Sequence, residues 1–437
     1  MPGVDTELEA REAAGRPIRV AMFGAGVTGR SVALQLLTPA PGIRLAAICN
    51  RSLDNAARAF AEAGAPSPRA VSSARALDGI VGRGGFAITD DPGVICEAGE
   101  IDLVLEATGT IEYAAEVVTR AIAAGKHVVL LNAELDSLLG PLLKARADAS
   151  GVVFTDSDGE EPGVAMTLLR YLRAIGLRPV AAGNLKGMVD HYRTPETQRG
   201  FAEKYGMDPR KATSFADATK LSMESTILAN ASGFRVARRG MYGPACAHVN
   251  EIAGLLPAEV MLAGGLVDYA LGAAPYTGAF VVVHEPNPAK QANLASCKLG
   301  DGPFYVFYTP FHLPHVQVAS SIGRAVVLGD PTVAPSGGPV CEVVTIAKRD
   351  LGAGEVLDGV GGFCAYGLIE NAAAARQQDA LPMGLSDGSR LLRSVRKDAL
   401  IRLADVDRPS GRLADRLWEE QNARWPIPEL AAEGAAR

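Results

Sequence analysis

A glycine-rich loop near the N-terminus constrains the fold of this chain more than any other feature. The loop, GAGVTG at residues 24–29, follows the apolar run 17–23 directly and opens a helical pattern that continues to residue 37. Gly24 permits a tight turn, Gly26 lets a ligand approach the backbone, and Gly29 permits close packing of the helix on the strand. The pattern predicts a strand, a glycine turn and a helix whose N-terminus faces the pyrophosphate of a dinucleotide.

Apolar runs and helical patterns alternate as far as about residue 155. The further runs lie at residues 43–49, 86–89, 101–107, 127–131 and 152–155. Strands that alternate with helices form parallel sheets, because each helix carries the chain back across a face of the sheet. The sequence therefore predicts an α/β fold with a doubly wound, parallel sheet of the Rossmann type.

The pattern changes after this region. Longer helices and isolated β-rich runs predict an α+β domain, and short strands with tight turns beyond the Pro/Gly-rich segment 331–339 predict a small β domain. The polar stretch 413–424 predicts an amphipathic helix that docks as a tail. The expected parts are a dinucleotide-binding domain at 17–155, an α+β domain at 156–335, a β domain at 340–407 and a C-terminal tail at 408–437.

Composition and charge narrow the class of partner. The formal net charge is −6, and no Lys/Arg cluster is dense enough to follow the phosphates of a nucleic acid. The 6 cysteines are scattered without a C-x-x-C pair, and neither a signal-peptide pattern nor a stretch of about 18 apolar residues occurs. We therefore expect a cytoplasmic protein with reduced thiols. Its expected partners are a small-molecule substrate and copies of itself, but neither nucleic acid nor membrane.

The residues after the second apolar run indicate the type of dinucleotide. A carboxylate at this place accepts from the ribose 2′-OH of NAD, whereas a cation pairs with the 2′-phosphate of NADP. Arg51 stands here, and the first acid is Asp54, so NADPH is the expected cofactor. A solvated surface charge is the alternative interpretation of Arg51. The predicted cofactor-binding residues, which include the ends of two later strands, are Gly24, Gly26, Val27, Thr28, Gly29, Asn50, Arg51, Ser52, Thr108, Gly109 and Asn132.

Two segments of the α+β domain bring together polar residues that an ordinary core would not contain. The acidic stretch 156–161 ends in Glu161 and follows a predicted strand, at the edge where ligands of open α/β sheets bind. Asp217, Lys220 and Glu224 stand at i, i+3 and i+7, and they share one face of a helix if the helix begins that early. Such a stripe can position a hydroxyl, transfer a proton or supply metal oxygens. The alternative is a solvated salt-bridge face.

Lys186 and two histidines are further candidates. Lys186 lies in a turn after an apolar strand, where it can donate to a substrate carbonyl or phosphate, and a bland surface lysine is the equal alternative. His312 and His315 stand at i and i+3, but Pro314 lies between them and no nearby acid completes a metal site. We therefore expect a structural role for these histidines.

The same segments carry a resemblance to a known family. The chain resembles the homoserine-dehydrogenase-related family of deoxyxylulose-phosphate-reductoisomerase-like oxidoreductases in the glycine loop, in EATG at 106–109, GKHVV at 125–129, EP at 161–162, the predicted helix 220–233, and residues 300–313. This resemblance spans nearly the whole chain. The segment IAKRDLGAGE at 346–355 also resembles the start of a SAF domain, which is a small β-clip module.

The resemblance implies an NADPH-dependent oxidoreductase with its catalytic residues in the α+β domain. The best-known activity of the family, part of isoprenoid biosynthesis, converts 1-deoxy-D-xylulose 5-phosphate to 2-C-methyl-D-erythritol 4-phosphate. The resemblance also implies Mg²⁺ or Mn²⁺ on vicinal oxygens, with Glu161 and Glu224 as protein ligands. The matching catalytic positions are Glu161, Lys186, Asp217, Lys220, Glu224 and Asn230.

The expected reaction is hydride transfer between NADPH and a small polar hydroxy-carbonyl or sugar-phosphate-like compound, with or without an isomerisation step. A rival is a dehydrogenase of the homoserine type, which would turn over an amino-acid semialdehyde without a metal. A rival outside catalysis is an NADP-binding regulatory protein, which the sequence favours only if the stripe at 217–224 faces solvent.

Overall fold

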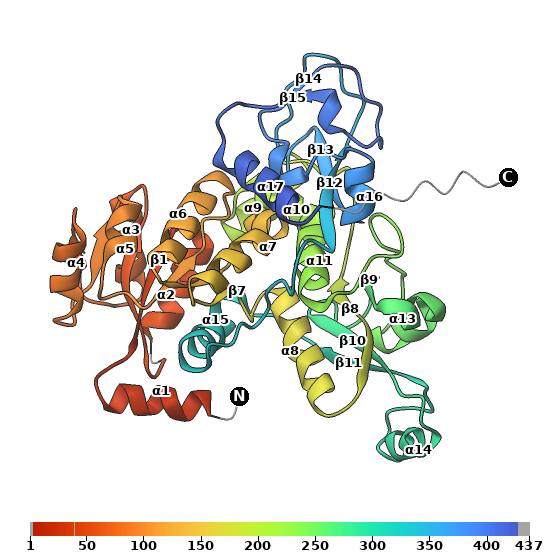
Figure 1. The fold of residues 1–437 in the computed structure, drawn as a ribbon, viewed down its shortest axis with the longest axis horizontal. Helices are drawn as coiled ribbons and strands as arrows, with labels where there is room; N and C mark the ends of the chain where they lie inside the picture. The colour runs from red at the N-terminus through yellow and green to blue at the C-terminus, as the bar shows by residue number, and fades with distance from the viewer. Residues whose placement is uncertain (1–2, 39, 427–437) are drawn as a thin grey trace.

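The computed structural model describes residues 3–38 and 40–426 of the chain. A seven-stranded sheet occupies the N-terminal part (Figure 1), with strand order β3-β4-β2-β1-β5-β6-β7 and parallel pairing throughout. Its strands are β1 (Ile18–Phe23), β2 (Ile43–Cys49), β3 (Arg69–Ala70), β4 (Ala87–Thr89), β5 (Leu103–Glu106), β6 (His127–Leu130) and β7 (Phe154–Asp156). The connecting helices are α2 (Val27–Leu37), α3 (Leu53–Glu62), α4 (Ala74–Val81), α5 (Pro92–Glu97), α6 (Glu112–Ala123) and α7 (Ala133–Ala149). The predicted doubly wound parallel sheet is confirmed.

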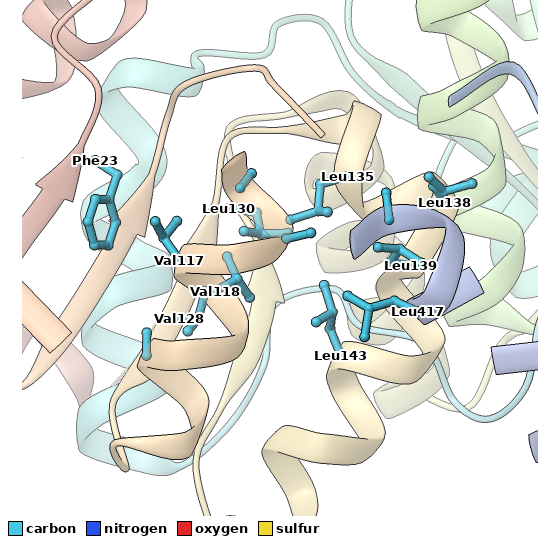
Figure 2. Close-up of a cluster of buried hydrophobic side chains, with 14 of the residues drawn as sticks. Phe23, Val117, Val118, Val128, Leu130, Leu135, Leu138, Leu139, Leu143 and Leu417 are labelled. Carbon is cyan, nitrogen blue, oxygen red and sulfur yellow. The ribbon is translucent and has the colours of Figure 1, made fainter. Parts of the chain in front are cut away.

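Helices cover both faces of this sheet because successive strand residues point to opposite sides. On one side Phe23 and Leu130 pack with Val117 and Val118 of α6 (Figure 2). On the other side Met22 packs in a separate cluster with residues of α2, α3 and α15 (Pro314–Gly323). The helix α15 comes from far along the chain and contacts α2 directly. It therefore ties the segment before it to the nucleotide-binding half of the molecule.

Strand β1 lies at the point where the strand order reverses. It pairs with β2 on one side and with β5 on the other, so the connections after β1 and β5 leave the sheet in opposite directions. A crevice forms outside the carboxyl ends of the strands at such a point, and ligands of open α/β sheets bind there. The glycine loop and Thr108 both stand at this edge.

A second, mixed sheet follows, with strand order β11-β10-β8-β9. Its strands are β8 (Arg178–Lys186), β9 (Leu266–Leu271), β10 (Ala279–His284) and β11 (Phe304–Thr309). Strand β8 pairs in parallel with β9 and antiparallel with β10. The helices of this part are α8 (Glu161–Ala174), α9 (Arg199–Tyr205), α10 (Pro209–Ala216), α11 (Thr219–Ser232), η1 (Val249–Glu251), α12 (Ile252–Leu255), α13 (Ala258–Gly264) and α14 (Pro288–Ser296). The predicted α+β region is thus present.

The two faces of the mixed sheet have different cover. Residues of α8 and α11 pack on the face that contains Ala182 and Val281, whereas α12 and α13 pack on the face that contains Ala181 and Val282. Helix α11 is buried along almost its whole length, because β12 and β13 of the C-terminal part lie against it as well. A helix buried on all sides must hold its polar residues in internal partnerships. Lys220 and Glu224 of α11 are both buried, so both need partners inside the protein.

The C-terminal part is a small antiparallel β module, as predicted. It contains the pair β12 (Cys341–Ala347) and β13 (Ala365–Asn371) and the short pair β14 (Arg390–Leu391) and β15 (Val406–Asp407). The remaining helical segments are α1 (Val4–Ala13), η2 (Arg324–Leu328), α16 (Ala372–Gln377), η3 (Met383–Leu385), η4 (Leu403–Asp405) and α17 (Leu413–Arg424). Within residues 3–38 and 40–426, no helix has the length and apolar character that crossing a membrane requires.

Helix α17 returns from the C-terminal part to the nucleotide-binding part. Leu417 of α17 lies beside Leu139 and Leu143 of α7 (Figure 2). The α7 helix contains Pro141, which removes a backbone donor from its ladder. Next to this proline, the side-chain amide of Gln421 accepts from the N–H of Leu142 (3.1 Å) and donates to the carbonyl of Leu138 (3.0 Å). The predicted tail helix therefore docks by a specific polar contact. Residues 427–437 of the expected tail lie outside the described part of the chain.

Candidate active site

The glycine loop has the geometry that its sequence predicts. Gly24 has a φ of +97°, and a Cβ there would lie 3.1 Å from the carbonyl oxygen of Ala107. A Cβ on Gly29 would lie 2.5 Å from the carbonyl oxygen of Gly24, so the helix packs too closely for any side chain. A Cβ on Gly26 would meet no atom within 4 Å. The turn and packing roles are thus confirmed, and open space remains where a ligand would approach.

The start of α2 is suited to an anion. Gly26 is its N-cap, and no side chain caps the first backbone N–H groups. These groups and the helix dipole favour a phosphate at this position. Val27 and Thr28 form the first turn and are not buried. The described residues therefore fit the pyrophosphate of a dinucleotide.

The three residues after β2 have different roles. Asn50 accepts from the N–H of Ala25 (3.0 Å) and donates to the carbonyl of Ser52 (2.8 Å), so it joins the glycine loop to the next loop. The hydroxyl of Ser52 accepts from the N–H of Asn55 and caps α3. Arg51 is exposed, and within the part of the chain described here its side chain has no hydrogen bond or ion pair. Arg51 is therefore the residue of this loop whose side chain can turn to a ligand.

Glu106, for which the sequence analysis proposed no role, organises the other edge of the crevice. Its buried carboxylate accepts from the N–H of Thr108 (2.8 Å) and from the side-chain amide of Asn132 (2.6 Å). Burial raises the pKa of Glu106 to about 7, although its hydrogen bonds with Thr108 and Asn132 oppose the shift. Asn132 also caps α7 through the N–H of Leu135. The side chains of Thr108 and Asn132 thus shape the loop, while Gly109 (φ +65°) makes its left-handed turn.

A cluster of four side chains from three elements lies in the α+β part of the molecule. Lys186, at the end of β8, pairs with Glu161 at the start of α8 and with Glu224 of α11, at 3.3 Å from the latter. Asn184, two residues earlier on β8, donates to the same two carboxylates at 2.6 and 3.3 Å. Both carboxylates are buried, whereas the side chain of Lys186 is 19% exposed. The side chain of Lys186 is therefore partly accessible.

Burial and charge set the protonation of this cluster. Burial raises the pKa of Glu161 well above its usual range, and the neighbouring Glu224 reinforces the shift. Burial also opposes ionisation of Glu224, but Lys186 and Lys220 outweigh it and lower the pKa of Glu224 to about 2. For Lys186, burial disfavours the charge, yet the two carboxylates prevail and raise its pKa. The cluster therefore holds a charged lysine, an ionised Glu224 and a proton on Glu161.

His312 joins this cluster from the loop before α15. Its Nδ1 lies 3.6 Å from Glu161 and 3.0 Å from the hydroxyl of Thr277. Burial lowers the pKa of His312, so the imidazole is neutral near pH 7. The sequence predicted a structural role because no nearby acid was visible. Folding supplies that acid from a segment about 150 residues earlier, which no local pattern reveals.

The two glutamates expected to bind a metal converge on a lysine instead. The ammonium of Lys186 lies between Glu161 and Glu224, where a cation shared by the two carboxylates would sit. Across the described ranges, no group of three or more His, Cys, Asp or Glu residues could hold a metal ion. The donor set does not fit Mg²⁺ or Mn²⁺, and no step below depends on either.

The expected helical stripe of Asp217, Lys220 and Glu224 is wrong. Helix α11 begins only at Thr219, and Asp217 ends α10, with Ala218 in a left-handed conformation (φ +75°) between the two helices. Asp217 consequently does not share a helix face with Lys220 and Glu224. It pairs with Lys348 of the β module at 2.9 Å. The tertiary contact with Lys348 thus overrides the helical periodicity read from the sequence.

Lys220 lies in a second buried cluster. Its Nζ is 3.7 Å from Glu134 of α7 and 3.8 Å from Glu160, and its side chain is 10% exposed. Burial disfavours its charge, but the carboxylates of Glu134 and Glu160 prevail and raise its pKa. The alternative of a solvated salt-bridge face is therefore wrong as well. Glu134 and Glu160 were not singled out as site residues, although both adjoin positions that were.

Asn230 lies away from both clusters. Its side-chain oxygen accepts from the N–H groups of Val340 (2.8 Å) and Cys341 (3.1 Å), where the chain enters the β module. The structure thus gives Asn230 a structural contact in place of the expected catalytic one. Asn184, by contrast, was missed, although its position two residues before Lys186 on one strand places both side chains on one face.

Two family models match adjacent parts of the chain. Residues 24–155 match the NAD-binding domain of homoserine dehydrogenase, and residues 159–318 match the catalytic domain of oxidoreductase DRL. The second range contains Glu161, Lys186, Lys220, Glu224 and His312. Neither range reaches the C-terminal β module, so its likeness to a SAF domain stays a prediction. A search of curated proteins gave no match.

Several solved structures match at low sequence identity. A probable dehydrogenase from Thermotoga maritima is 14% identical, over 73% of this chain and 90% of that one, with a TM-score of 0.41. The myo-inositol 2-dehydrogenase from Lactobacillus plantarum is 14% identical, over 72% and 91%, with a TM-score of 0.40. A 3-ketoreductase from Actinomadura kijaniata, in complex with NADP and TDP-benzene, is 14% identical, over 72% and 91%, with a TM-score of 0.37. The functional assignment therefore depends on the two family models, which identify an NAD(P)-dependent oxidoreductase.

Proposed function

We propose that this oxidoreductase uses NADPH to reduce the carbonyl group of a small polar hydroxy-carbonyl compound, and catalyses the reverse oxidation. The observation that carries the proposal is the buried cluster in which Glu161 and Glu224 hold Lys186, whose side chain is 19% exposed. An ammonium so fixed can donate to a carbonyl oxygen without reorganisation during the reaction. It would stabilise the negative charge that develops on that oxygen.

The residues around the crevice would hold the cofactor. The N-terminus of α2 at Gly26 would bind the pyrophosphate, and the side chain of Arg51 would pair with the 2′-phosphate. The loop of Thr108 and Gly109 would lie beside the nicotinamide ring. When bound, the nicotinamide supplies or accepts the hydride. The protein then has to orient the substrate, exclude water and move one proton.

Lys186 and Glu161 are placed to move that proton. Reduction of a carbonyl adds a hydride to the carbon and a proton to the oxygen. Lys186 would deliver the proton to the oxygen, and Glu161, which burial keeps protonated, would replace it through their direct contact. His312 lies next to Glu161 at the partly exposed edge and would return a proton from solvent. Lys220, held by Glu134 and Glu160, would orient polar groups of the substrate.

The match to the DRL catalytic domain favours this reading over a dehydrogenase of the homoserine type, because the homoserine dehydrogenase match ends at residue 155, before the lysine clusters. An isomerisation step of the 1-deoxy-D-xylulose 5-phosphate type remains part of the proposal to be tested with that substrate. The non-catalytic alternative required a solvent-facing stripe, and both Lys220 and Glu224 are buried. It therefore lacks the support on which it depended.

The test follows NADPH absorbance with purified protein and a panel of ketose phosphates, semialdehydes and hydroxyketones. With the substrate so found, Lys186→Met should lower kcat at least about a hundredfold, within the range usual for acid–base groups. The dissociation constant of NADPH should stay unchanged, since Lys186 lies beyond the nucleotide crevice. Lys204→Met, at an exposed position of α9, is the matched control and should leave kcat unchanged. Normal turnover by Lys186→Met would refute the proposed role.

A further inference from the structure

A cavity of about 740 Å³ lies where the three parts of the molecule meet. The loop after β5 contributes Thr108 and Gly109, α10 contributes Lys211 and Ser214, and the C-terminal part contributes Met383 and Leu385. This volume lies within the range of pockets for small molecules. Glu134, which contacts Lys220, also lines it, so the cavity adjoins the second lysine cluster.

Two of the acidic residues that line the cavity already have backbone partners. The carboxylate of Glu112 accepts from the N–H groups of Leu413 (2.6 Å) and Ala414 (3.0 Å) at the start of α17. The carboxylate of Asp208 accepts from the N–H of Arg210 (2.8 Å) and caps α10. Both carboxylates therefore stabilise the starts of helices and are not available as counter-ions for the cations that line the cavity.

The cations that line the cavity differ in their partners. Arg412 pairs with Asp415 and donates to the carbonyl of Leu385. Arg210 is exposed and reaches the carbonyl of Val360 at 3.5 Å. Lys211 is half-buried, and its ammonium has neither an ion pair nor a hydrogen bond among the residues that the structure describes. Within the described lining, Lys211 is thus the half-buried cation with unused donors.

Lys211 lies beside the loop that contains Gly109. Its Nζ would be 3.9 Å from a Cβ on Gly109, at the edge of the crevice. Lys211 lines the same cavity as Glu134, which contacts Lys220, so it lies near the second lysine cluster. A partly desolvated ammonium without a counter-ion is unfavourable, and an anion that binds beside it recovers the lost interaction.

We propose that Lys211 binds an anionic group, a carboxylate or a phosphate, carried by the substrate. This inference rests on the proposed function, because it places the anion on the compound whose carbonyl group lies at Lys186. The substrate class thereby narrows to anionic hydroxy-carbonyl compounds. Lysine suits this task as a compact point charge with three donors.

The anion site can be measured without turnover. Calorimetric titration of the enzyme–NADP⁺ complex with inorganic phosphate and with oxalate should show saturable binding. Lys211→Met should weaken that binding at least about tenfold, and Lys211→Arg should retain most of it, because the charge remains. Lys204→Met, at an exposed position of α9 outside the cavity lining, is the control and should change the binding less than about twofold. Lys211 is only half-buried, so we expect these variants to fold.

Three results would overturn the proposal. They are the absence of anion binding by the unmodified complex, an equal loss in Lys204→Met, and a tenfold loss of NADPH affinity in Lys211→Met. The last would show that the anion is a phosphate of the cofactor. Failure of the proposed function would give a different result. NADPH would then remain unoxidised with every substrate, while anion binding would still depend on Lys211.

Discussion

At the scale of single residues, Lys186 and Lys220 show how this molecule keeps lysines charged in its interior. Each ammonium has two carboxylates nearby, so the cost of burial is offset by attraction at short range. Removing either lysine would leave buried carboxylates without a counter-charge. The catalytic rate of variants at these positions must therefore be expressed per folded molecule, and the fraction of protein that is folded must be measured separately.

Arg51 is the residue that we expect to determine the choice between NADPH and NADH. We expect NADPH to bind at least tenfold more tightly than NADH, which is about 1.4 kcal/mol, because Arg51 can pair with the 2′-phosphate. Arg51→Ala should abolish most of this preference and leave NADH affinity nearly unchanged. Arg75→Ala, at an exposed position of α4, should leave the preference intact. Fluorescence titration with both nucleotides measures the ratio, and equal affinities for the unmodified protein would contradict the assignment.

Asp136 of α7 should make the protein less stable at neutral pH. Its carboxyl oxygens have no hydrogen-bond partner in the described chain, and burial raises its pKa from 3.8 to about 7. The folded protein therefore keeps a proton that the unfolded chain releases above pH 4, so the free energy of unfolding falls as pH rises from about 4 to 7.

Asp136→Asn tests this directly, because the amide cannot ionise. We expect the free energy of unfolding to rise on the order of 4 kcal/mol at pH 8 and to change by less than about 0.5 kcal/mol at pH 4, where the unfolded carboxyl is only about half ionised. Urea unfolding at the two pH values measures the difference. The same gain at both pH values would show that the effect does not come from ionisation.

At the scale of elements, local patterns predicted what local geometry determines. The glycine loop needs only its own residues to set the turn at Gly24 and the packing at Gly29, so the strand, loop and helix followed from the sequence. The end of α10 could not be predicted in this way. The left-handed Ala218 that separates α10 from α11 is stabilised by the burial of Asp217 against Lys348, which lies 131 residues further on.

The candidate site also combines features that the local sequence predicts with features that depend on tertiary contacts. Lys186 was predicted because it follows an apolar strand, whereas the approach of His312 to Glu161 depends on the docking of α15 against α2. Periodicity can place residues on one face of one element. It cannot state which faces of distant elements meet, and both lysine clusters are assembled from several elements.

Helix α17 offers an element-scale test. The amide of Gln421 bonds to the Leu138 carbonyl and the Leu142 N–H beside Pro141, so Gln421→Leu would leave both backbone groups buried without this partner. We expect a loss of about 1–3 kcal/mol in the free energy of unfolding. The exposed substitution Arg416→Ala on the same helix should cost less than about 0.5 kcal/mol. Urea unfolding followed by tryptophan fluorescence suits this test, because Trp418 and Trp425, the 2 tryptophans of the chain, lie at this helix. Equal stabilities would show that the contact is dispensable.

At the scale of the whole molecule, the β module is joined to the central part by a buried ion pair. Lys348, directly after β12, donates to the Asp217 carboxylate (2.9 Å), to the carbonyl of Arg193 (2.7 Å) and to that of Gly362 (2.8 Å). All three donors of the ammonium are used, so it has none left for a substrate. The pair also fixes Asp217, which lies two residues before the start of α11, the helix that supplies Lys220. The β module should therefore support the site without taking part in its chemistry.

Substitution of this pair separates support from catalysis. Lys348→Met leaves Asp217 buried without its counter-charge, and we expect the free energy of unfolding to fall by about 3–5 kcal/mol. Lys348→Met combined with Asp217→Asn should recover much of the loss, because the amide removes the charge and still accepts from the N–H of Thr219. In both variants the single-turnover rate of hydride transfer, per folded enzyme, should stay within about threefold of the unmodified value, in contrast to Lys186→Met. A hundredfold slower chemical step in folded Lys348→Met would place the β module in the catalytic machinery, and with it Asp217.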